Sequence, residues 1–246
     1  MKIGDVLVLD TNAMPWEPKT NPVTGKSNRR KTLMVDPDTG MNILITDNPA
    51  GNKTPTHIHN CSHGMFVLHG TQRTPVGDFG PGNFIWFPQG VVAEHGATDI
   101  DPVTVLFISN KTFDINFLDV TPAESEKEKI QVFDTNAMPW IEGYNEAAGK
   151  NLYRKPIIPE DPDTGVKIQI TNYPGGFINP KHDHHCAHGM YVLNGRLKTD
   201  VGEFGPGHFL WFPEGNVMFH GSADPYGPGV QVLFITNKKF DINYLK

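Results

Sequence analysis

The chain is a tandem repeat, and this duplication limits its possible folds more than any other feature. Residues 10–16, Asp-Thr-Asn-Ala-Met-Pro-Trp, return unchanged as residues 134–140. Residues 80–90 return as residues 205–215, with eight of eleven identical. The interval between the copies is 124 to 127 residues, which is the length of a domain and far too long for a solenoid repeat. The sequence therefore predicts two homologous domains.

The seam between the copies lies at residues 119–129. This segment is charged, contains proline and has no apolar period. It reads as a linker with room for a turn or two of helix. The expected domains are therefore residues 1–118 and residues 130–246.

Each copy consists of short apolar segments separated by turn residues. The 25 glycines and 21 prolines interrupt the chain between them, and no segment shows a helical apolar period. We therefore expect an all-β fold, either sandwich or barrel. The expected strands are residues 6–9, 41–46, 65–68, 83–87 and 103–109, and in the second copy 130–133, 166–171, 190–193, 208–212 and 230–236.

Charge and composition exclude several classes of partner. The net charge is −6 and no basic stripe carries interleaved aromatics, so we expect no nucleic-acid partner. The run Arg29-Arg30-Lys31 reads as a solvated loop. No apolar run approaches the roughly 18 residues of a membrane helix, and the N-terminus lacks an apolar leader, so a cytoplasmic location is expected. Cys61 and Cys186, at matched positions, should be free thiols in a reducing compartment.

Each copy carries the pattern H-x-H-x-C-x-H-G, at residues 57–64 and residues 182–189. Alternate residues of a strand share a face, so these histidines can converge. A further histidine recurs downstream in each copy. A lone histidine on a strand is usually structural, but four at one spacing, repeated after duplication, indicate metal ligands. The predicted ligands are His57, His59, His63 and His95, and His182, His184, His188 and His220.

These patterns resemble the two motifs of the cupins. The first, G-x5-H-x-H-x3-E-x6-G, matches except that His63 and His188 stand where the glutamate should be. The matching residues are Gly51, His57, His59 and Gly70, then Gly176, His182, His184 and Gly195. The second, G-x5-P-x-G-x2-H-x3-N, matches at Gly82, Pro88 and Gly90, then at Gly207, Pro213 and Gly215. His95 and His220 come two residues later than this motif asks, and its asparagine is missing.

The resemblance covers nearly all of both copies and implies a bicupin. Its fold would be two tandem double-stranded β-helix (jelly-roll) barrels with a metal at each mouth. The phrases H-G-M-F-V-L-H-G, F-P-Q-G and E-H-G-A-T resemble the ChrR-like cupins and, more loosely, acetylacetone and 2,4'-dihydroxyacetophenone dioxygenases. Cupins commonly pair through edge strands, so a homodimer is expected.

Replacing glutamate by histidine changes the charge of the site. Four neutral imidazoles leave a divalent metal at about +2 rather than +1, which makes it a stronger Lewis acid. An octahedral ion would keep two positions for a chelating substrate, or for one substrate oxygen and O₂. Iron(II) is favoured, and zinc, nickel, manganese, cobalt and copper are alternatives. A closed tetrahedral site, most naturally zinc, would instead be structural or regulatory.

The sequence therefore predicts a metal-dependent dioxygenase that acts on a small chelating substrate, such as a diketone or hydroxyketone. The first alternative is a non-catalytic ligand or stress sensor of the ChrR type. Another is a different metalloenzyme on the same scaffold, such as an isomerase or hydrolase. No catalytic residue beyond the metal ligands is predicted.

Several other residues are interpreted as structural rather than catalytic. Cys61 and Cys186 are interpreted as buried core residues, although a thiol near the metal is the alternative. One aromatic residue of each pair, Trp86-Phe87 and Trp211-Phe212, should face the barrel core. Met65 and Val67, with Met190 and Val192 in the second copy, share the parity of the histidines and could form a pocket floor.

Two acidic features are not expected to be catalytic. Glu94 is an unlikely general base for both sites, because Phe219 stands at its place in the second copy. Asp10-Thr11-Asn12 and Asp134-Thr135-Asn136 are expected to close a strand by turn formation through their own side chains.

Overall fold

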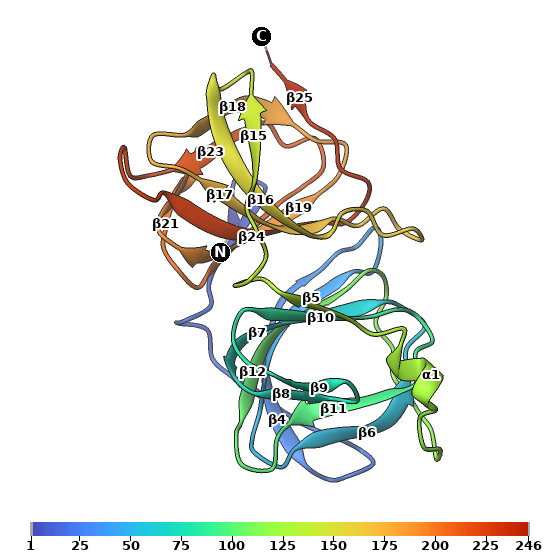
Figure 1. Cartoon of the computed structure of the whole chain (residues 1–246). Coiled ribbons are helices and arrows are strands. Elements are labelled where there is room, and N and C mark those ends of the chain that lie inside the picture. Colours follow the sequence, from blue (N-terminus) through green and yellow to red (C-terminus); the bar gives the residue numbers. More distant parts are fainter. Residues whose placement is uncertain (1, 246) are drawn as a thin grey trace. The chain divides into compact units, whose positions relative to one another are not determined.

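The computed structural model describes residues 2–245, and these are organised almost entirely as β-strands (Figure 1). The one α-helix of the described residues, α1 (Glu124–Lys127), falls in the segment predicted as a linker. The all-β prediction is confirmed. No helix among residues 2–245 is long and apolar enough to cross a membrane.

The chain forms two compact units, and they do not follow the sequence repeat. One unit is Pro15–Met138 and the other combines Met1–Met14 with Pro139–Lys246. The repeat placed the domains at residues 1–118 and 130–246. The structure differs because the leading strand of each copy is hydrogen-bonded into the large sheet of the other copy.

The unit Pro15–Met138 is built from two β-sheets (Figure 1). The larger has the order β14-β10-β7-β12-β5-β4-β3 and the smaller β13-β6-β11-β8-β9. The larger contains β3 (Glu17–Thr20), β4 (Ser27–Val35), β5 (Asn42–Asn48), β7 (His63–Gly70), β10 (Asn83–Phe87), β12 (Val103–Ser109) and β14 (Gln131–Asp134). The smaller contains β6 (Lys53–Ile58), β8 (Gln72–Thr74), β9 (Gly77–Phe79), β11 (Ala93–Ala97) and β13 (Asn116–Phe117).

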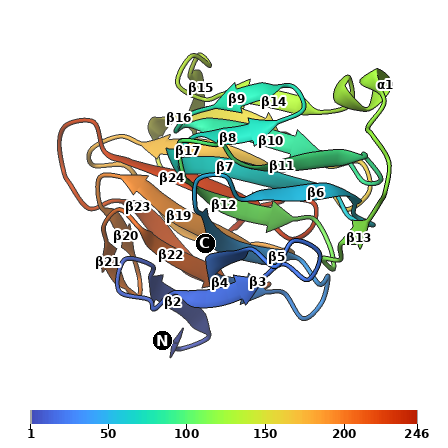
Figure 2. The same ribbon diagram turned by 90° about the horizontal axis from the view of Figure 1, so that it is seen from below.

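The second unit repeats this plan with sheets β1-β2-β22-β19-β24-β17-β16-β15 and β21-β20-β23-β18-β25. The larger contains β1 (Lys2–Ile3), β2 (Val6–Asp10), β15 (Ile141–Asn145), β16 (Lys150–Ile158), β17 (Ile168–Tyr173), β19 (His188–Asn194), β22 (His208–Phe212) and β24 (Val230–Thr236). The smaller contains β18 (Ile178–Asp183), β20 (Leu197–Thr199), β21 (Gly202–Phe204), β23 (Met218–Ser222) and β25 (Asn243–Tyr244). Figure 2 shows β2 beside β22 at one edge of this unit.

The repeated Asp-Thr-Asn motif secures each exchanged strand. After β2, the Asn12 amide nitrogen donates to Asp10 Oδ1 at 3.0 Å, which forms the expected turn. Thr11 Oγ1 donates to the carbonyl oxygen of Gly207 at 2.6 Å. Gly207 has a φ of +83°, and a Cβ there would lie 2.4 Å from Asn12 Nδ2, so glycine is required. The motif is therefore structural, as predicted.

The apolar core lies between the two sheets of each unit. In Pro15–Met138 it combines side chains of β7, β10 and β12 with Ala93 and Ala97 of β11. Trp86 turns away from this interior and stacks near Phe84, whereas Phe87 belongs to the core. The alternation expected for these aromatic pairs is confirmed, because neighbouring residues of a strand point to opposite faces.

The expectation for the basic run was wrong. The basic run Arg29-Arg30-Lys31 is not a loop but the middle of β4. Lys31 is buried, with its Nζ 4.1 Å from the centroid of the Trp16 ring, and Arg29 pairs with Asp47 at 2.6 Å. Long basic side chains can occupy a strand when their charges find partners at the sheet surface. All ten expected strands are present within a few residues of their predicted bounds.

Candidate metal centres

Three histidines converge between the two sheets of the Pro15–Met138 unit. His57 lies on β6 and His95 on β11, so both come from the smaller sheet, and His59 follows β6 directly. One ring nitrogen from each of the three lies within 4.8 Å of the others. The structure therefore brings His95 to the site although its spacing departs from the motif.

His63 lies beside this trio at the start of β7. Its ring centroid is 4.4 Å from that of His59 and 5.6 Å from that of His95. The ring is stacked on Phe87 at 4.9 Å and on Phe107 at 5.3 Å. Both ring nitrogens are buried without a hydrogen-bond partner among residues 2–245. A buried polar nitrogen without a partner is costly, so these atoms are candidates for ligand or metal contact.

Main-chain carbonyls orient the first two imidazoles. His57 Nδ1 lies 2.6 Å from the carbonyl oxygen of Pro55, and His59 Nδ1 contacts that of Asp114. A carbonyl can only accept, so Nδ1 carries the proton in both rings and Nε2 presents its lone pair. Metal-binding histidines are typically held in this way through the second ring nitrogen.

The second unit contains the same arrangement. Ring nitrogens of His182, His184 and His220 lie within 4.8 Å of one another, and the His188 ring centroid is 4.6 Å from that of His184. His182 Nδ1 contacts the carbonyl oxygen of Pro180 at 2.6 Å. His184 Nδ1 contacts that of Asp241.

Both ring nitrogens of His188 are buried without a partner within the described chain, as in His63. The two fourth-position histidines thus match in their unsatisfied atoms. The sequence-predicted fourth histidine adjoins each trio, and ligation by all eight histidines stays a prediction.

Burial keeps the clustered imidazoles neutral. Burial, with a smaller contribution from the neighbouring histidine, lowers the pKa of His57 and of His182 from 6.5 to about 4, against the opposing effect of the proline carbonyl hydrogen bond. Burial and the adjacent histidines also hold the pKa of His63 and His188 well below the ordinary value. At neutral pH the rings therefore offer lone pairs, the form in which imidazole binds a metal.

A cavity opens onto all three histidines of the first trio and onto two of the second. In the first unit it measures about 200 Å³ and is lined by His57, His59 and His95. In the second it measures about 250 Å³ and is lined by His184 and His220. Met65 lines the first cavity, whereas Val67, Met190 and Val192 belong to the cores, so the expected pocket floor is correct for Met65 alone.

The cysteines are buried core residues. Cys61 and Cys186 are free and fully buried, and no disulfide forms. Burial raises the pKa of each thiol to about 11, so both are protonated at neutral pH. Only the thiolate binds metals or reacts readily. Cys61 lies near His59 and Asp114, but the Asp114 carboxylate already accepts hydrogen bonds from Asn60 and Asn116.

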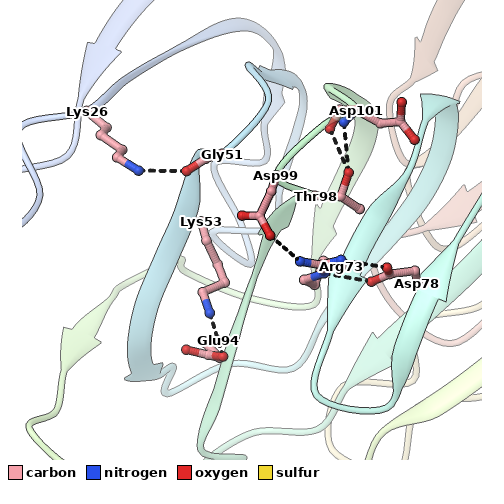
Figure 3. Close-up of polar contacts among 9 residues, drawn as sticks. All are labelled: Lys26, Gly51, Lys53, Arg73, Asp78, Glu94, Thr98, Asp99 and Asp101. Carbon is pink, nitrogen blue, oxygen red and sulfur yellow. Dashed lines mark hydrogen bonds and ion pairs between the residues drawn. The ribbon is translucent and has the colours of Figure 1, made fainter.

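Glu94 does not reach the first cavity. It forms an ion pair with Lys53, with 2.7 Å between Lys53 Nζ and Glu94 Oε1 (Figure 3). Figure 3 also shows Arg73 between Asp78 and Asp99 on the same surface. Glu94 therefore takes part in surface pairing, which agrees with its exclusion as a general base.

Several residues of the sites were missed. The repeat Phe113-Asp114-Ile115-Asn116 supplies the carbonyl that orients His59 and a ring 4.9 Å from it. Arg30 and Arg154 line the cavities. The exact return of the Phe-Asp-Ile-Asn sequence at 240–243 was the available signal, since turns alone rarely require such identity. Arg30 was missed because its run was interpreted as a loop, and Arg154 was not singled out in the sequence.

The fold and the paired histidine clusters define a bicupin. The sequence pattern of the ChrR cupin-like domain family matches residues 5–114 and again residues 128–233. The chain belongs to this family. No curated protein matches the sequence.

Solved structures of similar fold cover nearly the whole chain. A candidate dioxygenase of Nostoc punctiforme superposes with a TM-score of 0.79 at 14% identity, covering 98% of this chain and 87% of that one. Oxalate decarboxylase of Lactobacillus farciminis, in a formate complex, gives 0.65 at 14% identity, with 100% and 90% covered. The Bacillus subtilis oxalate decarboxylase gives 0.63 at 13%, with 97% and 78% covered. At such identities the likeness establishes the bicupin fold alone.

Proposed function

We propose that the protein is a metal-dependent dioxygenase that cleaves a small chelating substrate of the diketone or hydroxyketone type. The observation that carries this proposal is the opening of each histidine trio onto a cavity of about 200 to 250 Å³. A structural metal site is normally closed by its protein ligands, whereas a catalytic one keeps positions for substrate. The described similarity to a candidate dioxygenase agrees with this class.

The residues of the chain fit a divalent transition metal. His57, His59 and His95 would hold it in the first unit, with His63 as the fourth ligand, and the equivalent residues would do so in the second. Bound iron(II) would supply the redox chemistry with O₂ and polarise a chelating substrate oxygen. The carbonyls of Pro55 and Asp114 keep the Nε2 atoms directed towards the site.

The apolar side chains around the trio would exclude water. Leu44, Met65, Phe107 and Phe113 line the first cavity, and a low dielectric strengthens the interaction between the metal charge and an enolate oxygen. No acid lines either cavity among the described residues, so a proton would leave to solvent or to the substrate itself rather than to a carboxylate base.

The decisive experiment measures metal and oxygen separately. Elemental analysis should give two metals per chain, and His57→Ala with His59→Ala, or His182→Ala with His184→Ala, should each reduce this to one. The iron(II)-loaded protein should then consume O₂ with members of a panel of β-diketones and hydroxyketones. Tetrahedral zinc in both sites, together with no O₂ uptake from any substrate, would reject the proposal.

A non-catalytic sensor is the second candidate, and the match to the ChrR cupin-like family favours it. It requires ligand binding without turnover and a protein partner that responds. Metal and ligand binding without O₂ uptake, together with co-purification of a sigma factor, would select it. A homodimer and a cytoplasmic location stay predictions.

A further inference from the structure

The cavity of the second unit contains two cations and no acid. Arg154 from β16 and Lys167, just before β17, both line it, together with Gln169. Within residues 2–245 neither cationic side chain takes part in a hydrogen bond or an ion pair. The acid that most favours the charged Lys167 is Glu160, which pairs with Lys239 at 3.4 Å. The protein as a whole has a net charge of −6, so this local excess of positive charge is specific to the site.

The two cations are held close to the histidine cluster. Lys167 Nζ lies 5.0 Å from the centroid of the Phe240 ring, and that ring is 5.1 Å from the ring of His184. The guanidinium group of Arg154 lies over Gly143, where an added Cβ would be 3.1 Å from Nη2. Burial and the charge of Arg154 lower the pKa of Lys167, so each cation destabilises the other. An anion bound between them would relieve this repulsion.

The first cavity lacks this pair, although it keeps the arginine. Arg30 pairs with Thr46 across the sheet as Arg154 does with Thr171, so the two arginines occupy one register position. At the position of Lys167 the first copy has Asn42. Leu44 stands in place of Gln169, and the second cation of this cavity, Lys19, is an exposed residue of the edge strand β3. A solvated lysine contributes little to anion binding.

We propose that the cavity of the second unit binds a chelating substrate that also carries a carboxylate group, which Arg154 and Lys167 receive beside the metal centre. This inference rests on the proposed function, because the dicarbonyl end of the substrate is assigned to the metal. Arginine offers a planar pair of donors that matches a carboxylate, and lysine adds a second charge. The first cavity takes the neutral counterpart.

The test compares two ligands that share a β-diketone and differ in one carboxylate. 2,4-Dioxopentanoate and acetylacetone are titrated by calorimetry into iron(II)-loaded protein under nitrogen, after the metal content has been measured. We expect one tight 2,4-dioxopentanoate site per chain. Arg154→Met should weaken it about tenfold or more and Lys167→Asn about fivefold, because each removes a charge-assisted contact, while acetylacetone binding changes less than about twofold.

Matched variants separate recognition from folding. Arg30→Met removes the same residue from the other cavity and should leave the tight site unchanged, and Arg154→Lys should recover part of the lost affinity. Asn42→Lys should tighten 2,4-dioxopentanoate binding in the first cavity. An equal loss for both ligands in Arg154→Met, an effect of Arg30→Met as large as that of Arg154→Met, or no binding of 2,4-dioxopentanoate would overturn the inference. O₂ uptake with diketones but no carboxylate preference rejects only the inference, whereas carboxylate binding without O₂ uptake rejects only the dioxygenase.

Discussion

The two cavities share their histidines and several other lining residues, and they differ at a few positions beside the histidines. Each cavity has a histidine trio with a fourth histidine beside it. In both units a proline carbonyl and an aspartate carbonyl orient the first two histidines. Around them, Leu44 and Phe117 of the first cavity correspond to Gln169 and Tyr244 of the second. The two copies therefore share the residues that would hold a metal and differ at a few of those that would meet a substrate.

The two cavities also differ in the hydrogen bonds between their polar side chains. In the second cavity Tyr244, Asn145 and Asn179 form a closed set of hydrogen bonds of 2.7 to 2.9 Å. Asn179 Nδ2 then lies 3.4 Å from His182 Nε2. The first cavity has Thr54 and Phe117 at the places of Asn179 and Tyr244, so it cannot form this set. The closed set of hydrogen bonds beside the histidines therefore belongs to the second cavity.

The largest effect should come from removing the exchanged strand. Deleting residues 2–13 takes away β2, whose Val6 and Val8 are 2% and 6% exposed within the core of the second unit. Two buried valines contribute roughly 1.5–3 kcal/mol each, so that unit should lose more than about 3 kcal/mol. Limited proteolysis with mass spectrometry should then show cleavage within residues 139–245 first.

A shorter deletion of residues 2–4, which leaves β2 intact, is the control for that experiment. It should preserve most of the resistance to protease. If the longer deletion leaves both units equally resistant, the exchanged strand does not stabilise the second unit and the division into compact units is wrong.

Acid should destabilise both units through their histidines. The unfolded pKa of 6.5 exceeds the folded value of about 4 for His57 and His182, so the unfolded chain binds more protons between these values. Stability should be complete above pH 6.5 and fall as the pH drops towards 4. At about 1.4 kcal/mol per pKa unit the loss reaches about 3 kcal/mol for each of these residues.

Thermal unfolding of the metal-free protein from pH 7.5 to pH 4.5 measures this loss. The exposed His69, which has Asn194 at its place in the second copy, provides the control variant His69→Gln. Its melting temperature should follow the same pH curve. A melting temperature independent of pH across this range would show that the clustered imidazoles are not kept neutral by folding.

The features that could be predicted from the sequence were those with a strong local pattern. Repetition of the histidine spacing was enough to select all the clustered imidazoles, because four matched positions are improbable in a core that needs only apolar residues. Strands with a continuous apolar face, such as residues 83–87 and 103–109, were also found at their observed bounds. These features are local in sequence.

What failed depended on contacts distant in sequence. The exchange of β2 and β14 could not be seen, since each strand looks equally compatible with either copy. β4 was missed because Arg29 and Lys31 find their partners only across the sheet and on Trp16. Arg30 and Arg154 therefore escaped attention, although they distinguish the cavities from ordinary apolar pockets.

A smaller effect is expected when the missing glutamate is restored. His63→Glu and His188→Glu should leave two metals per chain, because a glutamate at this place lowers the charge of the site without removing the trio. In the metal-free protein each substitution places a carboxyl group among apolar rings, which are Phe87 and Phe107 in the first unit and Phe212 and Phe234 in the second, at a cost of roughly 1–3 kcal/mol. Elemental analysis decides, and loss of one metal for each substitution would indicate a closed four-histidine site.

The smallest effect concerns the hydroxyl that distinguishes the two cavities. Tyr244→Phe removes a group that accepts from Asn145 at 2.7 Å and donates to Asn179 at 2.8 Å, so the second unit should lose about 1 kcal/mol. The reverse change, Phe117→Tyr, should give no matching gain, because the first cavity offers Thr54 instead of Asn179. Urea unfolding of both variants measures the pair. Equal and opposite changes in the free energy of unfolding would show that the hydroxyl contributes independently of its partners. The expected asymmetry would show that it contributes only together with Asn145 and Asn179.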